Sequence, residues 1–372
     1  MGAPEPLQVV VASWNVGCTE PPPESLAAWL ESACGADVYA VALQEVVDLN
    51  SPVSYCSCCD GGGLSKEAVG WEERISAELL SYERVACRQL VGMVLLVYVS
   101  AALAPFVSAD VQAAGTGPLG FGNKGAVAAT LLLKGSSLTF LCCHLAAGKK
   151  GPHKRNAEHH ALVSRLRLGV QGSAGGDGAP PAGAAGRQLL FWCGDLNYRL
   201  ALGNEEVRAL AAAGDLPALL AADELTICRV AGDAFAGFAE GAIHFPPTYK
   251  YDLHSDGFDS SAKQRAPAYC DRVLWRAEPN VSCDAYTSHP HLQSSDHRAI
   301  SARMRVELLP FEPSLQPAFR AGRSVLEALA GAMRRCVPCL EPSTSAYELI
   351  GSVPPSVRDS LAAKYGDPAL TG

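Results

Sequence analysis

Short runs of apolar, often β-branched residues recur along the chain, and small or polar residues close each of them. Uninterrupted apolar runs of about four to eight residues are typical of strands that are buried on both faces. Between two of these runs, Lys134, Gly135 and Ser136 predict a hairpin turn. The sequence therefore predicts strands at 9–14, 37–43, 126–133, 137–145 and 189–193.

Other segments have the spacing of helices rather than strands. Trp71, Ile75 and Leu79 recur every four residues, which places them on one face of a helix. Polar residues fill the positions between them, as expected for a helix that covers a sheet. The predicted helices are 25–32, 71–81 and 153–168.

One uncharged stretch, Leu90–Val107, has two possible interpretations. Its 18 residues reach the lower limit of a membrane-spanning helix. However, Gly92 and Pro105 interrupt it, and the β-branched run at 94–99 is typical of a buried strand. We therefore predict a strand followed by a turn.

Polar side chains of types that bind metals or transfer protons follow the apolar runs. Asn15, Glu45, His144, Asp195 and Asp296 each come just after such a run. This placement predicts loops at one edge of a sheet scaffold, where functional residues often lie. Because the strands are numerous and the helices irregularly spaced, we expect an α+β fold with two packed sheets rather than a doubly wound parallel sheet.

Composition sets the protein class. Of the 372 residues, 48% are hydrophobic and 18% are charged, which predicts a folded chain with a substantial core. The formal net charge of −8 disfavours a non-specific nucleic-acid binder, since such proteins are usually basic. A Gly-, Ala- and Pro-rich stretch predicts a flexible loop at 169–187.

The character of the chain changes after residue 308. Pro310, Pro313 and Pro317 break the pattern, and Ser324 with Glu327 forms a capping box before a short helix. We predict a main domain at 1–308 and a helical or partly disordered appendage at 309–372 with a helix at 325–335.

The 14 cysteines come without a secretory leader, so we expect free thiols and a cytoplasmic protein. Two groups leave a zinc site open as an alternative to a loop and a tail turn. These are Cys56, Cys58 and Cys59, and the C-x-x-C pair Cys336 and Cys339.

The acidic residues suggest a cation site. Asp195 and Asn197 lie two residues apart after a strand, and Asp296 is followed by His297. A glutamate near a strand end, such as Glu45, needs a cation or a partner, and hard oxygen ligands suit Mg²⁺. We predict that Glu45 and Asn15 hold Mg²⁺.

Basic residues gather in an otherwise acidic chain. The loop 120–125 combines glycines with Asn123 and Lys124, a pattern that lets the backbone approach an anion. This concentration favours several phosphates in one pocket over a solvated surface. Further basic segments are Lys149, Lys150, His153, Lys154 and Arg155, then Tyr249 and Lys250, then Lys263 and Arg265.

From about residue 8 to residue 305, the chain resembles the inositol polyphosphate 5-phosphatases. The resemblance implies a DNase I-like fold, a four-layer α/β/β/α sandwich of two packed mixed sheets. The motifs that carry it are SWNVG at 13–17, LQE at 43–45, GNKGAV at 122–127, HLAA at 144–147, RN at 155–156, FWCGDLNYR at 191–199, PTYKY at 247–251, RAPAYCDRVLW at 265–275 and SDH at 295–297.

The resemblance implies roles for individual residues in Mg²⁺-dependent release of a 5-phosphate. Asp195 activates the attacking water, and Asp271 orients His297. The implied catalytic set is His144, Asp195, Asn197, Asp271, Asp296 and His297. The implied substrate-binding set is Asn123, Lys124, Lys154, Arg155, Asn156, Tyr249, Lys250, Lys263, Arg265 and Arg272.

Several alternatives stay open. A nuclease of the same superfamily would need a long basic surface, and a phosphoinositide-binding protein without activity would not need every catalytic residue. The substrate is a phosphoinositide such as phosphatidylinositol 4,5-bisphosphate, a soluble inositol polyphosphate, or both. A lipid substrate implies peripheral contact with a membrane. We expect a monomer that does not bind nucleic acid.

Overall fold

The computed structural model describes residues 6–49, 63–117, 120–133, 135–148, 151–166, 168 and 187–308. These residues belong to one compact unit, Met1–Pro310. The predicted loop at 169–187 lies outside the described residues except for Arg187. The predicted appendage at 309–372 with its helix, Lys149 and Lys150, and the two cysteine groups lie wholly outside them.

The first sheet has six strands and is built from both ends of the domain. Its central pair, β1 and β2, is parallel, and the remaining pairs are antiparallel. In spatial order the strands are β11 (Val281–His289), β12 (Ala299–Val306), β1 (Leu7–Asn15), β2 (Val38–Gln44), β4 (Met93–Ser100) and β3 (Tyr82–Leu90).

The second sheet repeats this plan with the middle of the chain. Its central pair, β7 and β8, is parallel, and antiparallel strands flank it on both sides. In spatial order the strands are β5 (Val107–Gly115), β6 (Gly125–Leu133), β7 (Ser136–His144), β8 (Gln188–Asp195), β10 (Asp271–Arg276) and β9 (Phe238–Glu240).

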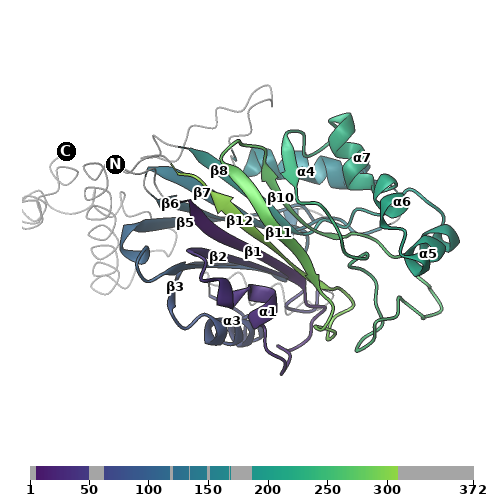
Figure 1. Ribbon diagram of the computed structural model, residues 1–372, viewed down its shortest axis with the longest axis horizontal. Coiled ribbons are helices and arrows are strands. Elements are labelled where there is room, and N and C mark those ends of the chain that lie inside the picture. Colours follow the sequence, from purple (N-terminus) through teal and green to yellow (C-terminus); the bar gives the residue numbers. More distant parts are fainter. Residues whose placement is uncertain are drawn as a thin grey trace, which may run out of the picture. The chain divides into compact units, whose positions relative to one another are not determined.

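Helices cover the outer face of each sheet, so the domain has four layers (Figure 1). Trp29 of α1 and Trp71 of α3 pack on the first sheet, and Leu162 of α4 and Leu225 of α7 pack on the second. The helices are α1 (Ala27–Leu30), α3 (Lys66–Glu78), α4 (His153–Arg165), α5 (Asn204–Ala213), α6 (Leu216–Ala221) and α7 (Glu224–Ala231).

Alternate residues of one strand enter different cores. Val9 and Val11 of β1 face the layer between the sheets, whereas Val10, Ala12 and Trp14 face α1 and α3. Because both faces are buried, the strand sequence is uniformly apolar and does not alternate. This arrangement confirms the predicted α+β sandwich of two packed mixed sheets.

The predicted strands are confirmed to within two residues, and the boundaries of the predicted helices differ. The helix predicted at 71–81 begins earlier, at Lys66, because the Ser65 hydroxyl caps it by accepting from the amide of Ala68. The helix predicted at 25–32 is interrupted at Glu31, whose φ of 48° is left-handed.

The uncharged stretch is the buried strand β4, flanked by β2 and β3. Within the described residues, no helix has the length and apolar character needed to cross a membrane.

Candidate active site

Three candidate residues lie in a row across neighbouring strands of the second sheet. His144 ends β7 and pairs with Asp195, which ends β8, and Asp195 pairs with Asp271, which begins β10. Residues opposite one another on adjacent strands point to the same face of a sheet. Sequence positions far apart in the chain are therefore brought to one edge by strand register alone.

The glycine before Asp195 allows this close arrangement. Gly194 has a φ of +133°, and a Cβ atom there would lie 2.0 Å from the carbonyl oxygen of Cys143. No other residue type fits so close an approach of β8 to β7. The following Asn197 also has a positive φ, 56°, which turns its side chain back toward Asp195.

The Asp195 carboxylate is the centre of the site. Its Oδ2 atom accepts from Nδ2 of Asn15 at 3.0 Å and from Nδ2 of Asn197 at 3.1 Å, and it lies 3.1 Å from Nε2 of His144. Burial alone would raise the pKa of Asp195, but His144, His297 and Lys124 outweigh burial and hold that pKa well below its usual range. Asp195 is therefore ionised at neutral pH.

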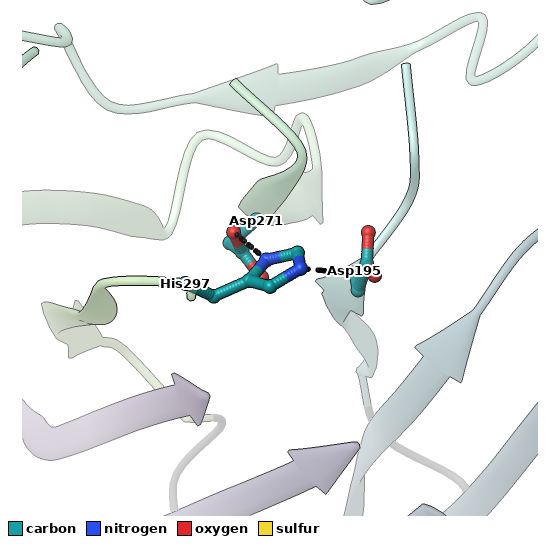
Figure 2. Close-up of side chains that lie close together, drawn as sticks. All are labelled: Asp195, Asp271 and His297. Atoms are coloured by element: carbon teal, nitrogen blue, oxygen red, sulfur yellow. Dashed lines mark hydrogen bonds and ion pairs between the residues drawn. The ribbon is translucent and has the colours of Figure 1, made fainter. Parts of the chain in front are cut away.

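His297, which precedes β12, is held between two carboxylates (Figure 2). Its Nδ1 atom lies 2.9 Å from Oδ2 of Asp271, and its Nε2 atom lies 3.9 Å from Oδ2 of Asp195. Burial would lower the pKa of His297, but Asp271 and Asp195 raise it to about 10. The ring is therefore a charged donor at neutral pH, with Nδ1 donating to Asp271.

Asp271 in turn is fixed by a second donor. The Thr248 hydroxyl donates to its Oδ2 atom at 2.6 Å, while its buried Oδ1 atom has no hydrogen-bond partner within the described structure. Burial raises the pKa of this carboxyl group. The free oxygen is thus available to a further ligand.

The oxygen donors at this edge fit a divalent cation. Single ligand atoms of Asp195, Asp271 and His297 lie within 4.8 Å of one another. Since Nδ1 of His297 faces Asp271, only its Nε2 atom remains for a cation, and the carboxylates supply the oxygen ligands. Glu45, at the left-handed φ of 54°, adds a third carboxylate, with Oε1 3.7 Å from Nε2 of His144. Hard oxygen ligands of this kind suit Mg²⁺ or Ca²⁺.

The remaining acid, Asp296, is paired rather than free. Its carboxylate forms an ion pair with Nζ of Lys250. Burial would raise the pKa of Asp296, but His297 and Lys250 lower it. The preceding Tyr249 packs its ring on His297, with 4.6 Å between centroids. Asp296 and Lys250 therefore lie at the rim of the His297 site.

The predicted basic residues divide into two groups. Nζ of Lys124 contacts Nε2 of His144, which places Lys124 in the site beside the half-buried Asn123. Lys154 and Lys263 are exposed, and the side chain of Arg265 is 35% exposed. Among the described residues, Lys154 and Lys263 form no hydrogen bond or ion pair with the Asp195 cluster.

Three residues predicted to bind substrate have structural partners instead. Arg272 is 1% exposed and pairs with Asp223 and Glu240 at 2.8 and 2.7 Å. Arg155 is 2% exposed and pairs with Glu224. Asn156 is buried and accepts from the Tyr198 hydroxyl at 2.6 Å; we therefore assign all three to the scaffold.

Sequence reasoning did not assign roles to Thr248 or Arg199. Nη2 of Arg199 donates to Oδ1 of Asn197 at 2.5 Å, and the guanidinium lies 4.6 Å from the Tyr249 ring centroid. Arg199 follows Asn197 by two residues, so its position in the motif was the available signal. No sequence signal identified Thr248, because its hydroxyl contacts Asp271 only in the folded chain.

Comparison with known proteins agrees with this geometry. Residues 12–303 match the family described as Endonuclease/Exonuclease/phosphatase family 2. The chain is 36% identical over 299 residues to the Type II inositol 1,4,5-trisphosphate 5-phosphatase of Mus musculus, covering 78% of this chain and 29% of that protein. It is 38% identical over 248 residues to Synaptojanin-1 of Homo sapiens, covering 64% of this chain and 15% of that protein. The chain thus spans less than a third of either relative.

Solved structures show the same fold. The inositol polyphosphate 5-phosphatase domain of a synaptojanin, solved with inositol (1,4)-bisphosphate and a calcium ion, aligns with a TM-score of 0.67 and 30% identity, covering 81% of this chain and 84% of that one. Cimex nitrophorin aligns with a TM-score of 0.64 at 19% identity, covering 82% of this chain and 99% of that one, which shows a shared fold alone. The chain belongs to the inositol polyphosphate 5-phosphatase branch of the endonuclease/exonuclease/phosphatase family.

Proposed function

We propose that this chain is a Mg²⁺-dependent phosphomonoesterase that hydrolyses the 5-phosphate of phosphoinositides and soluble inositol polyphosphates. The observation that carries the proposal is the convergence of His144, Asp195, Asp271 and His297 on one sheet edge. The named activity of the mouse relative, a 5-phosphatase of inositol 1,4,5-trisphosphate, supports the substrate class. So does the inositol (1,4)-bisphosphate bound to the synaptojanin domain, since that compound is the expected product.

In the proposed reaction, water attacks phosphorus in line with the leaving 5-oxygen. Asp195 is ionised and accepts from Nδ2 of Asn15 and from both Nδ2 and the backbone amide of Asn197. So held, it accepts a hydrogen bond from the water and takes its proton as the new P–O bond forms. A carboxylate with so low a pKa is a weak base. Its larger contribution is to orient the water, and the proton moves only as attack acidifies it.

Positive charge and N–H donors around Asp195 stabilise the phosphoryl oxygens. His297 is a cation at neutral pH, and Asp271 fixes its orientation through Nδ1. The Asn197 side chain donates through Nδ2 to Oδ2 of Asp195, and Nε2 of His144 lies 3.1 Å from the same oxygen. Each such donor typically contributes about 10²–10³-fold in rate.

Glu45, with Asn15 beside it, is the proposed holder of Mg²⁺. The cation supplies charge neutralisation to the phosphate and the leaving alkoxide. Asn15 already donates to Asp195 through Nδ2, so this amide links the cation-binding edge to the residue that orients water. The calcium ion named with the synaptojanin domain supports a divalent cation at this site.

Remote phosphates of the substrate meet the basic rim. Tyr249, Lys250, Lys263 and Arg265 are the proposed contacts of the 4-phosphate. Asn123, Lys124 and Lys154 are the proposed contacts on the 1-phosphate side. Such remote contacts convert binding energy into orientation of the scissile phosphate.

The proposal includes the protein's setting. We place the enzyme in the cytoplasm as a monomer that does not bind nucleic acid and reaches lipid substrates by peripheral contact with the membrane surface. The nine cysteines within the described residues are all free thiols, which supports a reducing compartment.

A phosphate-release assay tests the function. The panel contains inositol 1,4,5-trisphosphate, vesicles with phosphatidylinositol 4,5-bisphosphate, and single-stranded DNA, each with Mg²⁺ and with excess chelator. We expect release from the inositides that chelator abolishes, and no cleavage of DNA. Chelator-resistant release would contradict the metal role, DNA cleavage would favour the nuclease, and binding without release would identify an inactive phosphoinositide-binding protein.

A further inference from the structure

A loop at 259–265, between β9 and β10, is closed at its base by a buried acid. Asp259 is 1% exposed, and its carboxylate accepts from the amide of Ser261 at 3.1 Å and from the amide of Arg265 at 2.7 Å. The amide of Asp259 donates to the carbonyl of Lys250 at 2.9 Å. The base of the loop is thereby tied to the segment that carries Tyr249 and Lys250.

This loop brings positive charge to the edge of the site. Lys263 is exposed at its tip, and the Arg265 side chain is partly exposed. The charge of Arg265 acts on the Tyr249 hydroxyl, and the Tyr249 ring packs on His297. An anion bound by the loop would therefore lie beside the group that interacts with the scissile phosphate.

Helix α5 holds both ends of the loop from outside. Nη2 of Arg208 donates to the carbonyl of Asp259 at 2.6 Å and to the carbonyl of Arg265 at 3.0 Å. One turn earlier, Nδ2 of Asn204 donates to the carbonyl of Gln264 at 2.5 Å. The acceptors are backbone carbonyls, so the contact fixes the shape of the loop and does not occupy its cationic side chains, of which Arg265 lies 4.0 Å from the Asp259 carboxylate.

We propose that Arg208 is a positioning residue that sets the affinity of the enzyme for a second phosphate next to the scissile one. Its guanidinium joins the two ends of the loop that carries Lys263 and Arg265, although Arg208 lies on a helix of the insertion between β8 and β9. This inference rests on the proposed function. It adds a determinant of substrate choice that lies outside the catalytic cluster.

The kinetic test compares wild type with Arg208→Met on two soluble substrates, inositol 1,4,5-trisphosphate and inositol 1,5-bisphosphate, which lacks the neighbouring phosphate. We expect KM for the trisphosphate to rise about tenfold, because two hydrogen bonds from a charged donor to the loop are lost. KM for the bisphosphate and both kcat values stay within about twofold. Arg208→Lys restores part of the affinity, since an ammonium still donates to a carbonyl.

Arg305→Met is the matched control, because it removes a half-exposed arginine that pairs with Asp284. We expect it to change neither KM. Equal rises of both KM values in Arg208→Met would overturn the proposal, as would an unchanged trisphosphate KM. If wild type releases phosphate from neither substrate, the proposed function fails, and the exchange experiment below still decides whether Arg208 holds the loop.

Hydrogen exchange gives a readout that is independent of turnover. In Arg208→Met the amides of Ser261 and Arg265 exchange at least about fivefold faster than in wild type, because the loop opens more often. Unchanged exchange would overturn the clamp. If Arg208→Met does not fold, Asn204→Ala replaces it, with an expected KM rise of about threefold for the trisphosphate and faster exchange at Arg265.

Discussion

Two adjacent residues of β10 belong to two different clusters of buried charge. Asp271 points to the site and meets His297 and Thr248. Arg272 points to the other face, where it meets Asp223 and Glu240. Successive residues of a strand face opposite sides, so one step along the chain separates the reaction centre from a structural network.

The two clusters differ in how their charges are balanced. On the structural side, Arg272 and Arg229 face Asp223 and Glu240, which gives two cations for two anions. Asp223 also caps α7 by accepting from the amide of Thr226, so the network joins a helix to the sheet. Every charge in this network has an opposite partner within 3.1 Å, although Oδ1 of Asp223 and Nε of Arg229 are buried without a hydrogen-bond partner within the described structure.

The site cluster is left incomplete by comparison. Asp271 pairs with the charged imidazole of His297 at 2.9 Å, but Asp195 lies 3.9 Å from that ring, and Glu45 lies 3.7 Å from His144. Lys124 adds a second cation through its contact with His144. The buried Oδ1 atom of Asp271 has no hydrogen-bond partner within the described structure. A buried carboxylate without a close cation is costly in a folded protein unless a bound cation or substrate completes it. This need distinguishes the site cluster from the structural network, whose charges pair within 3.1 Å.

The comparison predicts that Asp195→Asn removes activity and preserves the fold. The amide keeps the volume of the carboxyl group and loses its charge, so water is no longer oriented or deprotonated. We expect kcat for phosphate release to fall about 10²–10⁴-fold. Circular dichroism checks that thermal unfolding stays cooperative. Turnover within tenfold of wild type would contradict the role of Asp195.

On the other face of β10, we expect Arg272→Met to destabilise the fold. It leaves Asp223 buried without its cation and leaves Glu240 with Arg229 alone, and breaking a buried pair in this way costs about 3–5 kcal/mol. Urea unfolding measures the loss. Arg305→Met, in the half-exposed pair with Asp284, is the control and should cost less than about 1 kcal/mol. A stable Arg272→Met variant that has lost only substrate affinity would restore Arg272 to the substrate-binding set.

The predicted strands follow from a purely local signal. The uniformly apolar segments at 9–14 and 189–193 are strands because both of their faces are buried. By contrast, the four edge strands β3, β5, β9 and β11 and the interior strands β10 and β12 were missed. The edge strands β3, β5 and β11 carry mixed sequences because their faces are partly exposed, and arginines interrupt the apolar pattern of β10 and β12. Their strand state depends on the neighbour they pair with.

The sequence predicted those site residues that lie in recognisable motifs. His144, Asp195 and Asp271 meet by register, and their motifs identified them. Arg272 lies beside Asp271 in the same motif, yet a strand turns alternate side chains to opposite faces, and only the partners across the sheet show which role each has. A linear motif does not separate the residues that touch substrate from those that support them.

Arg199 tests the comparison further, because it is a half-buried cation that contacts the site cluster and not the structural network. By donating to Oδ1 of Asn197, it turns Nδ2 of that amide toward Asp195. Arg199→Met frees the amide to rotate, and we expect kcat to fall about 10–100-fold with KM little changed. Steady-state kinetics measure both. A rise in KM with kcat unchanged would show that Arg199 binds substrate directly and does not position Asn197.

His159 offers a third kind of buried ionisable group, one with no polar partner among the described residues. It is 5% exposed, and both ring nitrogens lack hydrogen bonds. Its ring packs between Phe235 at 4.1 Å and Trp192 at 5.1 Å. Burial, with a smaller effect of His160, lowers the pKa of His159 to about 3, so the folded protein holds this ring neutral.

The unfolded chain therefore binds a proton at His159 at pH values where the folded chain keeps the ring neutral. Stability from this group is complete above about pH 6.5 and falls as the pH drops from there toward 3, by about 2 kcal/mol at pH 5. Unfolding in urea at pH 7 and pH 5 measures the loss. His159→Phe should remove it, whereas His289, whose pKa is lowered to about 4 by burial and His291, continues to contribute in that variant. An unchanged pH dependence in His159→Phe would mean that the aromatic cluster opens to water before the ring is protonated.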